Sequence, residues 1–320
     1  MSPDTQSTTI PRHVRHGSNA GQPVSRRDGV LKVTGAATYA ADNHPDGMLH
    51  AVIVPSTIAR GRVRSLDVTA AKAHPGVVEV ITPDNRIPLH FDPNDKMPPF
   101  GFRVEGLQDD SVRYVNQPIA VVVAETLEAA TEGARLLAPR YEEELPRTGL
   151  DNGERYDAEA VGIGSPAVTA AGDIEAGFSA ATRVTEAEYY TPPQYHNAME
   201  PHAVVAEWNG DHLTLDMPNQ ALRMSAASSA QYFGIPAENV LIRSPFLGGG
   251  FGSKAILNGP QILGILAARQ LGRPVKLVLT RAQMYGPVGH RGRTWQKLRL
   301  GTDAVGKLTA LHHTSIGATS

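Results

Sequence analysis

Hydrophobic positions in the second half of the chain predict a strand, a helix and a second strand in succession. Residues 240–243 form a short apolar run that is typical of a buried strand. Residues 260–271 carry apolar side chains at helical spacing and are followed by Gly272, a residue type that commonly ends helices. Residues 275–279 are apolar again. The pattern therefore predicts a glycine-rich connection between a strand and a largely buried helix.

The rest of the chain alternates between apolar runs and polar, turn-forming segments. Residues 117–124 are apolar after Gln117, which predicts a strand buried on both faces. Asn209, Gly210 and Asp211 separate two further runs and predict a hairpin turn. Strands are predicted at residues 49–54, 77–81, 183–190, 203–208, 212–216, 298–301 and 307–316, and helices at residues 67–74, 126–137 and 222–233. Mixed strands and helices of this kind predict an α+β fold.

Polar and glycine-rich stretches divide this pattern into domains. Residues 1–25 are polar and predict a mobile tail. A compact unit is predicted over residues 26–146, interrupted by a long loop rich in Pro and Asp at residues 82–110. Residues 147–180 are predicted to be a linker, and residues 181–320 a second unit. We expect the first unit to be separate from the second.

Composition excludes several classes of protein. With 41% hydrophobic and 19% charged residues the chain is ordinarily globular, and its net charge of −2 favours neither nucleic acid nor anionic membranes as partners. The absence of cysteine excludes disulfides and cysteine-bound iron–sulfur clusters within the chain. No apolar run approaches the ~20 residues of a membrane helix, and the first residues do not resemble a secretory signal. We therefore expect a soluble, cytoplasmic protein, or a periplasmic one if a signal-bearing partner exports it.

The glycine-rich connection reads GGGFGSK over residues 248–254. It does not fit the dinucleotide fingerprint G-x-G-x-x-G, because Ser253 stands at the third glycine, nor the P-loop, because Lys254 is followed by alanine. Glycines leave backbone N–H groups accessible, so the segment can approach a bulky or anionic ligand closely. A flexible surface turn is the alternative. Phe251, a large aromatic residue among glycines, suggests a side chain held over a ligand.

Two further motifs accompany the glycine-rich run. Residues 26–42 read R-x-D-G-x-x-K-V-T-G-x-A-x-Y-A-x-D, and Gln194 is followed by Glu200 and His202 in the pattern Q-x-x-x-x-x-E-x-H. Together with GGGFGSK, these motifs resemble those of the large, molybdenum-binding subunit of the xanthine dehydrogenase/aldehyde oxidase family. The matches keep the family's order and span residues 26–291.

The resemblance implies an a/b hammerhead domain over residues 26–146 and the first part of a molybdopterin-binding domain over residues 181–320. It implies a subunit of a molybdenum hydroxylase that oxidises aldehydes or N-heteroaromatic compounds with water as the oxygen source. The implied cofactor is molybdenum–molybdopterin, with the cytosine dinucleotide form as an alternative. FAD and a 2Fe-2S cluster are implied on an FAD subunit and an iron–sulfur subunit, which would complete a heterotrimer.

The resemblance also assigns cofactor-binding residues. In related subunits the residue matching Gln194 hydrogen-bonds an oxygen of the molybdenum or pterin, and a glutamine suits this role because it donates and accepts without carrying charge. A solvent-exposed loop glutamine is the alternative. In the glycine-rich run, the implied cofactor contacts are Gly249, Gly250, Phe251 and Gly252. Gln194 and Phe251 are expected near the metal, with no residue of the chain ligating it directly.

Neighbouring residues receive mainly structural expectations. We expect Glu200 and His202 to form a buried pair and not a metal site, since two residues offer too few ligands. Lys254 is expected either to meet a phosphate or to be solvated. Asn219 and Gln220 are expected to begin the following helix or to reach the cofactor.

Two positions depart from the family, and the family's subunits extend further. Ala255 replaces the glutamate that binds the heterocycle in purine-oxidising members, so purine oxidation is disfavoured. Asn116 stands in a turn where the family usually has glycine. Family subunits continue to a catalytic glutamate beyond the position of Ser320, so we expect an N-terminal portion without a catalytic residue and inactive alone. A non-catalytic truncated remnant or assembly module is the alternative.

Overall fold

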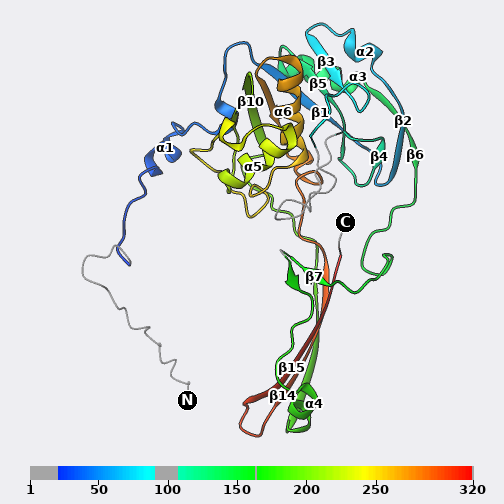
Figure 1. Cartoon of the computed structure of the whole chain (residues 1–320), viewed down its shortest axis with the longest axis vertical. Coiled ribbons are helices and arrows are strands. Elements are labelled where there is room, and N and C mark those ends of the chain that lie inside the picture. The colour runs from blue at the N-terminus through cyan, green and yellow to red at the C-terminus, as the bar shows by residue number, and fades with distance from the viewer. Residues whose placement is uncertain (1–20, 91–106, 163, 319–320) are drawn as a thin grey trace, which may run out of the picture. The chain divides into compact units, whose positions relative to one another are not determined.

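The computed structural model divides into two compact units, Met1–Thr38 and Tyr39–Ser320 (Figure 1). The residues it describes are 21–90, 107–162 and 164–318. Most of the expected N-terminal tail, and the middle of the expected long loop rich in Pro and Asp, lie outside them. The division falls after Thr38, not at the boundary before Arg26 that the sequence suggested.

The described part of the first unit, residues 21–38, contains one short helix, α1 (Gly29–Thr34). Asp28 precedes the helix and forms an ion pair with Lys32 at 2.6 Å. The helix ends where Gly35 adopts a φ of 77°, a left-handed conformation that glycine enters without strain. None of the helical residues is buried.

Strands from both predicted domains form one seven-stranded sheet in the second unit. In spatial order the strands are β12 (Val240–Arg243), β11 (His212–Asp216), β10 (Ala203–Asn209), β13 (Val275–Val278), β1 (Leu49–Pro55), β5 (Pro118–Ala124) and β3 (Val77–Ile81). β1 runs parallel to β13, with Leu49 opposite Val275, and antiparallel to β5. The expectation that residues 26–146 form a separate compact unit is therefore wrong. The physical reason is that β1 is largely buried and would lose the partner of one hydrogen-bonding edge without β13.

Two helices cover the central part of this sheet. α6 (Gly259–Leu271) is buried along most of its length. A Cβ at Gly264 would lie 2.5 Å from Val204, so glycine permits the close packing of α6 on β10. α3 (Leu127–Leu136) packs against β1 and β5. Successive residues of β5 alternate between the hydrophobic cluster that contains α6 and a second cluster, so this strand is buried on both faces as its apolar run predicted.

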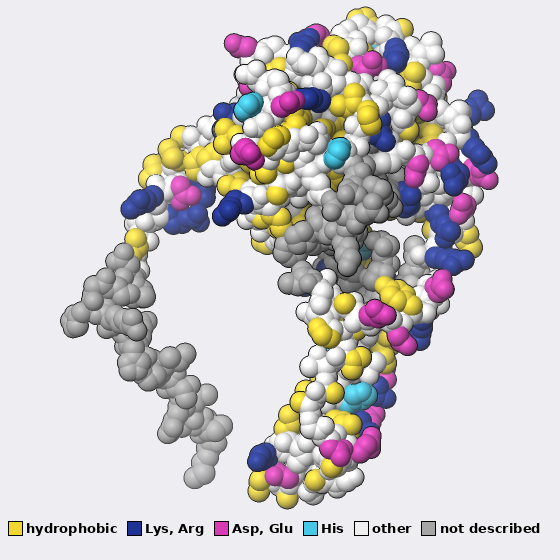
Figure 2. Space-filling view, in the orientation of Figure 1, with side chains coloured by type: hydrophobic (Ala, Val, Ile, Leu, Met, Phe, Trp, Pro, Cys, Tyr) yellow, Lys and Arg dark blue, Asp and Glu magenta, His cyan; other side chains and the backbone are white. Residues whose placement is uncertain are grey.

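Three smaller sheets complete the described fold. The first consists of β15 (Leu308–Gly317), β14 (Thr294–Thr302) and β9 (Arg183–Thr191), the second of β4 (Ser111–Val112), β2 (Gly61–Asp67) and β6 (Ala138–Glu143), and the third of β7 (Ala160–Val161) and β8 (Ser165–Pro166). Figure 2 shows acidic and basic side chains side by side along the first sheet, where Lys297 and Arg299 pair with Glu186. β2 and β6 escaped the sequence prediction because exposed polar side chains interrupt their apolar alternation.

The hairpin predicted at residues 209–211 is confirmed, because β10 and β11 pair antiparallel there. The remaining helices are short except one. They are α2 (Thr69–Lys72), α4 (Ile174–Ser179) and α5 (Leu222–Phe233), with 3₁₀ turns η1 (Ala40–Asp42), η2 (Ala237–Asn239) and η3 (Ala282–Met284). α4 lies in the segment predicted to be a linker, and Asp173 caps it by accepting from the N–H groups of its first turn. Asn116 adopts a φ of 69°, a conformation that asparagine tolerates better than most residues. Within the described residues, no helix is both long and apolar enough to cross a bilayer.

Candidate functional site

The glycine-rich loop connects β12 to α6 and combines two backbone constraints. Gly249, Phe251 and Gly252 have φ values of 93°, 54° and 100°. Phe251 is therefore a bulky residue in the left-handed region, a costly state that clusters at functional sites. A Cβ at Gly250 would lie 2.4 Å from Oε1 of Gln220, so a side chain there would displace the Gln220 side chain from its place beside the loop. The glycines thus permit one specific turn in which Phe251 is 70% exposed.

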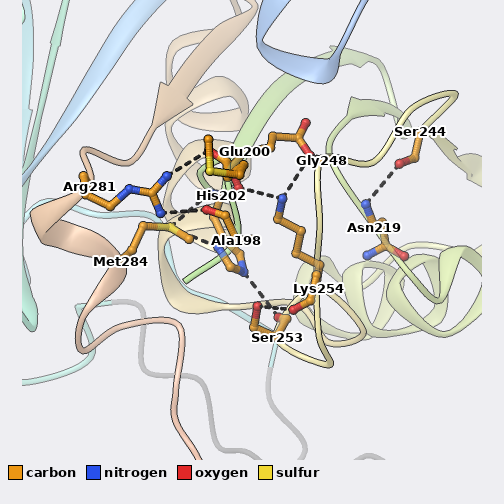
Figure 3. Close-up of polar contacts among 12 residues, drawn as sticks. Ala198, Glu200, His202, Asn219, Ser244, Gly248, Ser253, Lys254, Arg281 and Met284 are labelled. Carbon is orange, nitrogen blue, oxygen red and sulfur yellow. Dashed lines mark hydrogen bonds and ion pairs between the residues drawn. The ribbon is translucent and has the colours of Figure 1, made fainter. Parts of the chain in front are cut away.

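A buried ion pair closes the base of this loop (Figure 3). Lys254 is fully buried, and its Nζ donates to the backbone oxygen of Glu200 at 2.8 Å and to Oε2 of the same residue at 2.9 Å. The N–H of Gly248 donates to that Oε2 at 2.8 Å. Burial lowers the pKa of Lys254, and the hydrogen bond to Glu200 opposes this shift. Neither expected environment of Lys254, phosphate or solvent, is observed.

His202 lies beneath the loop and is 1% exposed. Its Nε2 faces the backbone oxygen of Ser253 at 3.3 Å, and its Nδ1 faces the Met284 sulfur at 3.3 Å. Because a carbonyl oxygen only accepts, the neutral ring places its proton on Nε2. Burial lowers the pKa of His202 to about 4. The expected pair of Glu200 with His202 is therefore wrong, since His202 is buried and Glu200 is 12% exposed, and each has other partners.

Arg281 fixes the segment that runs behind the loop. Its Nη1 donates to Oδ1 of Asn197 at 3.1 Å and to the backbone oxygen of Ala198 at 2.6 Å, and its Nη2 to that of Met199 at 2.8 Å. Ala198 is buried. A Cβ built at Gly249 would lie 3.4 Å from the Cβ of Ala198. The segment therefore supports the loop from one side. Nothing in the sequence patterns identified Arg281, because its partners are mostly backbone oxygens.

Asn219 and Gln220 support the loop from the other side. Oδ1 of Asn219 accepts from the N–H of Ala221 at 2.7 Å, and its Nδ2 donates to Oγ of Ser225 at 2.7 Å. Asn219 therefore contacts the start of α5 but does not cap the helix, because the N-cap is Ala221 and has no side-chain cap hydrogen bond. Oε1 of Gln220 accepts from the N–H of Gly252 at 3.0 Å. The backbone N–H of Gln220 donates to the oxygen of Lys254 at 2.8 Å. The sequence did not predict these contacts of Gln220 with the loop.

Gln194 lies on a separate exposed segment. Its backbone exchanges two hydrogen bonds with Arg291, at 3.0 and 2.9 Å, and Nη1 of Arg291 donates to Oε1 of Gln194 at 3.2 Å. Tyr195 beside it stacks on His290 with ring centroids 5.3 Å apart. Among the described residues, no hydrogen bond joins Gln194 to the glycine-rich loop. Four of the five predicted site residues are consecutive in the loop, and the side-chain hydrogen bond described for Gln194 is with Arg291.

The tip of the loop presents free hydrogen-bond donors. Among the described residues, the N–H groups of Gly249, Gly250 and Phe251 have no hydrogen-bond partner. Gly249 is half-buried and Gly250 is buried, whereas Phe251 is exposed. Three consecutive N–H groups without a partner suit an anionic or oxygen-rich ligand. Within the described part of the chain, no group of three or more His, Asp or Glu side chains is arranged to hold a metal ion. The geometry thus favours a ligand held by backbone hydrogen bonds.

Two family models match the chain in succession. The first is the a/b hammerhead domain of aldehyde oxidase and xanthine dehydrogenase, over residues 34–145, and the second is the molybdopterin cofactor-binding domain, over residues 162–320. Both matches agree with the order of domains that the motifs implied.

Curated relatives match along most of the chain. The aldehyde oxidoreductase molybdenum-binding subunit PaoC of Escherichia coli K12 is 39% identical over 297 residues, covering 92% of this chain and 39% of PaoC. Subunit gamma of the 6-hydroxypseudooxynicotine dehydrogenase complex of Paenarthrobacter nicotinovorans is 31% identical, covering 91% and 38%. The chain therefore spans about two fifths of the length of these relatives.

Solved structures share the fold. Quinoline 2-oxidoreductase from Pseudomonas putida 86 superposes with a TM-score of 0.75 at 26% identity, covering 91% of this chain and 38% of that one. Matched over both family models, by relatives above 30% identity and by this fold, the chain belongs to the molybdenum-binding subunits of the xanthine dehydrogenase/aldehyde oxidase family.

Proposed function

We propose that the chain holds the molybdenum cofactor of a hydroxylase that oxidises aldehydes or N-heteroaromatic compounds with water as the oxygen source. The observation that carries this proposal is the loop tip, with three unpartnered N–H groups beside a base held by the hydrogen bonds of Glu200 and Lys254. The relatives support it, because PaoC is an aldehyde oxidoreductase subunit and the second relative belongs to a dehydrogenase complex. No observation favours the alternative of a non-catalytic remnant or assembly module.

The residues of the loop fit molybdenum–molybdopterin. When bound, the cofactor supplies the redox centre that accepts electrons from the substrate. Its oxygen atoms and phosphate are acceptors, which match the donors on Gly249, Gly250 and Phe251. The absence of side chains at the glycines lets a bulky group approach the backbone. Gly252 contributes differently, because its N–H is already bound to Gln220 and holds the turn in place.

Gln194 would act as a donor to the same cofactor. Arg291 donates to Oε1 of Gln194, so that oxygen is occupied while the amide Nε2 has no partner among the described residues. An amide nitrogen can only donate, which suits an oxygen of the cofactor. None of these groups titrates near neutral pH, so we assign them cofactor binding and not proton transfer.

The finer features of the complex follow as parts of the proposal. An iron–sulfur subunit and an FAD subunit would carry the electrons away, since this chain has no cysteine to bind a cluster. The cytosine dinucleotide form of the pterin is one form that the site would accept. Ala255 stands where purine-oxidising members have a glutamate, and its methyl group cannot accept a hydrogen bond from a purine. A cytoplasmic location fits this set of partners.

The test is to purify the chain with its associated subunits from a host that makes the cofactor. We expect stoichiometric molybdenum by elemental analysis and aldehyde oxidation with an artificial electron acceptor. Gln194→Ala should lower turnover about ten- to a hundredfold, because one hydrogen bond to a charged or strongly polar group is lost. Phe251→Ala should also lower it. An assembly that folds and contains no molybdenum would contradict the proposal.

A further inference from the structure

The ion pair between Lys254 and Glu200 differs from the other ion pairs of the described residues. Its side chains are 0% and 12% exposed, whereas every other pair has at least one partner that is more than a quarter exposed. Charged groups are costly to remove from water, and this cost is recovered only with good geometry and further hydrogen bonds. Here Oε1 of Glu200 is buried and has no hydrogen-bond partner among the described residues. Compared with two apolar side chains, this ion pair therefore costs more free energy to bury.

One carboxylate oxygen joins both ends of the glycine-rich loop. Oε2 of Glu200 accepts from the N–H of Gly248, where the loop begins, and from Nζ of Lys254, where it ends. The backbone adds two more bonds, from the N–H of Glu200 to the oxygen of Gly248 at 3.0 Å and from Nζ of Lys254 to the oxygen of Glu200. Figure 3 shows Lys254 reaching across to Glu200 beside Gly248. An apolar pair could fill the same space, but it could not bind Gly248.

We infer that Lys254 and Glu200 are positioning residues, which hold the loop so that the N–H groups of Gly249, Gly250 and Phe251 face one ligand together. The inference rests on the proposed function, because the ligand is the cofactor proposed for the loop tip. Neither residue touches the ligand in this account, since Lys254 is fully buried. The length of the Glu200 side chain matters more than its charge, because the length decides whether one atom reaches both loop ends.

Two substitutions separate length from charge. Glu200→Gln keeps the length and an acceptor oxygen but removes the charge, whereas Glu200→Asp keeps the charge and shortens the side chain by one methylene. The enzyme assembled with its other subunits is purified for each variant, and molybdenum per folded chain is measured together with the melting temperature. Lys276→Met is the matched control for Lys254→Met. Lys276 is also a buried lysine, 6% exposed, but its Nζ donates to the backbone oxygen of Ala41 and not to the loop.

Positioning predicts that Glu200→Gln retains most of the molybdenum while Glu200→Asp loses it about tenfold, the effect of one hydrogen bond to a charged group. Lys276→Met should lower the melting temperature and leave the molybdenum content of the folded fraction unchanged. The double variant Lys254→Met/Glu200→Leu should recover thermal stability relative to Lys254→Met but remain poor in molybdenum.

The opposite pattern overturns the inference. If Glu200→Asp loads as well as the wild type and Glu200→Gln does not, charge compensation explains the pair. A wild-type molybdenum content in the double variant Lys254→Met/Glu200→Leu would also show that charge compensation, and not positioning, explains the pair. If the double variant does not fold, the comparison of Gln with Asp at position 200 still decides. A wild-type assembly without molybdenum would instead reject the proposed function, so the two failures are distinguishable.

Discussion

The base and the tip of the glycine-rich loop lie within a few residues of each other and differ in almost every physical property. At the base, Gly248 and Lys254 are bound to Glu200, and the lysine is fully buried. At the tip, Gly249 and Gly250 have no hydrogen bond on their N–H groups among the described residues, and Phe251 is 70% exposed. The base is therefore hydrogen-bonded and buried, whereas the tip has unpartnered N–H groups and an exposed aromatic ring at Phe251.

This difference shows how a short loop can have a fixed backbone conformation and still keep N–H groups free for a ligand. A turn that used its own N–H groups to hold its shape would have none left for a ligand. Here side chains from elsewhere in the chain, Glu200 and Gln220, accept from the loop at its edges. The central donors are then free. The strained φ of 54° at Phe251 persists because these contacts fix the backbone on both sides.

The largest expected effect comes from breaking the base. Lys254→Met leaves the carboxylate of Glu200 buried and unpaired, so the free energy of unfolding should fall by about 3–5 kcal/mol. Glu125→Gln is the comparison, because the pair of Glu125 with Arg273 is exposed and solvent screens such pairs, so its loss should change stability little. Denaturant unfolding monitored by fluorescence measures both. Equal losses for the two variants would show that the base is not distinct from the surface.

The second effect concerns pH and again the base. Burial lowers the pKa of His202 to about 4 from an ordinary value of 6.5, so protons bind the unfolded state more tightly. Stability is therefore fully present above pH 6.5 and declines as pH falls towards 4, by roughly 3 kcal/mol for this group. His202→Gln should reduce the slope of unfolding free energy against pH in this window. An unchanged slope would mean that His202 titrates normally.

The sequence allowed much of the fold and part of this contrast to be predicted. Apolar runs predicted the strands of the central sheet and the helix α6, because these elements are largely buried and their hydrophobic positions recur regularly. The shared sheet was missed, because no local pattern shows that β1 pairs with β13 more than two hundred residues later. The exposed strands β2 and β6 were missed because charged side chains mask their alternation.

In the site, the order of the motifs identified the glycine-rich loop, but it did not identify the contacts through which other residues hold the loop in place. The residue types of GGGFGSK pointed to a ligand-facing backbone, and the role of its four loop residues in cofactor binding stays a prediction. The pairing of Lys254 with Glu200 depends on two segments meeting in space, and 53 positions separate them in the sequence. Gln220 and Arg281 bind backbone atoms, which have no sequence signature. For Asn116 the sequence indicated only a turn where the family usually has glycine, and its left-handed φ of 69° was not predicted.

A third prediction tests the close packing at the base. A Cβ at Gly248 would lie 2.5 Å from Cβ of Glu200, and Gly248 has no positive φ. Gly248→Ala should therefore destabilise by overpacking, at about 1–3 kcal/mol. Gly153→Ala is the matched control, because a Cβ there meets nothing within 4 Å and its φ is not positive. Thermal unfolding should separate the two variants, and equal melting temperatures would contradict the tight base.

The smallest effect on stability is expected at the tip. Phe251→Gly relieves the left-handed strain, about 1–2 kcal/mol, and adds unfolded-chain entropy of about 0.5–1 kcal/mol, so the net change should be within about 1 kcal/mol. The exposed ring loses little burial. The same variant should bind less cofactor in the assembled enzyme. A large loss of stability would show that Phe251 has a structural role in the chain itself.

The most direct test of the account is amide hydrogen exchange across the loop, resolved to single residues, in the assembly made with and without the cofactor. We predict that loading protects the N–H groups of Gly249, Gly250 and Phe251 strongly. The N–H groups of Gly248 and Gly252, already bound to Glu200 and Gln220, should change little. Equal exchange at the tip in the two preparations, with molybdenum present in one, would contradict the claim that this loop holds the cofactor.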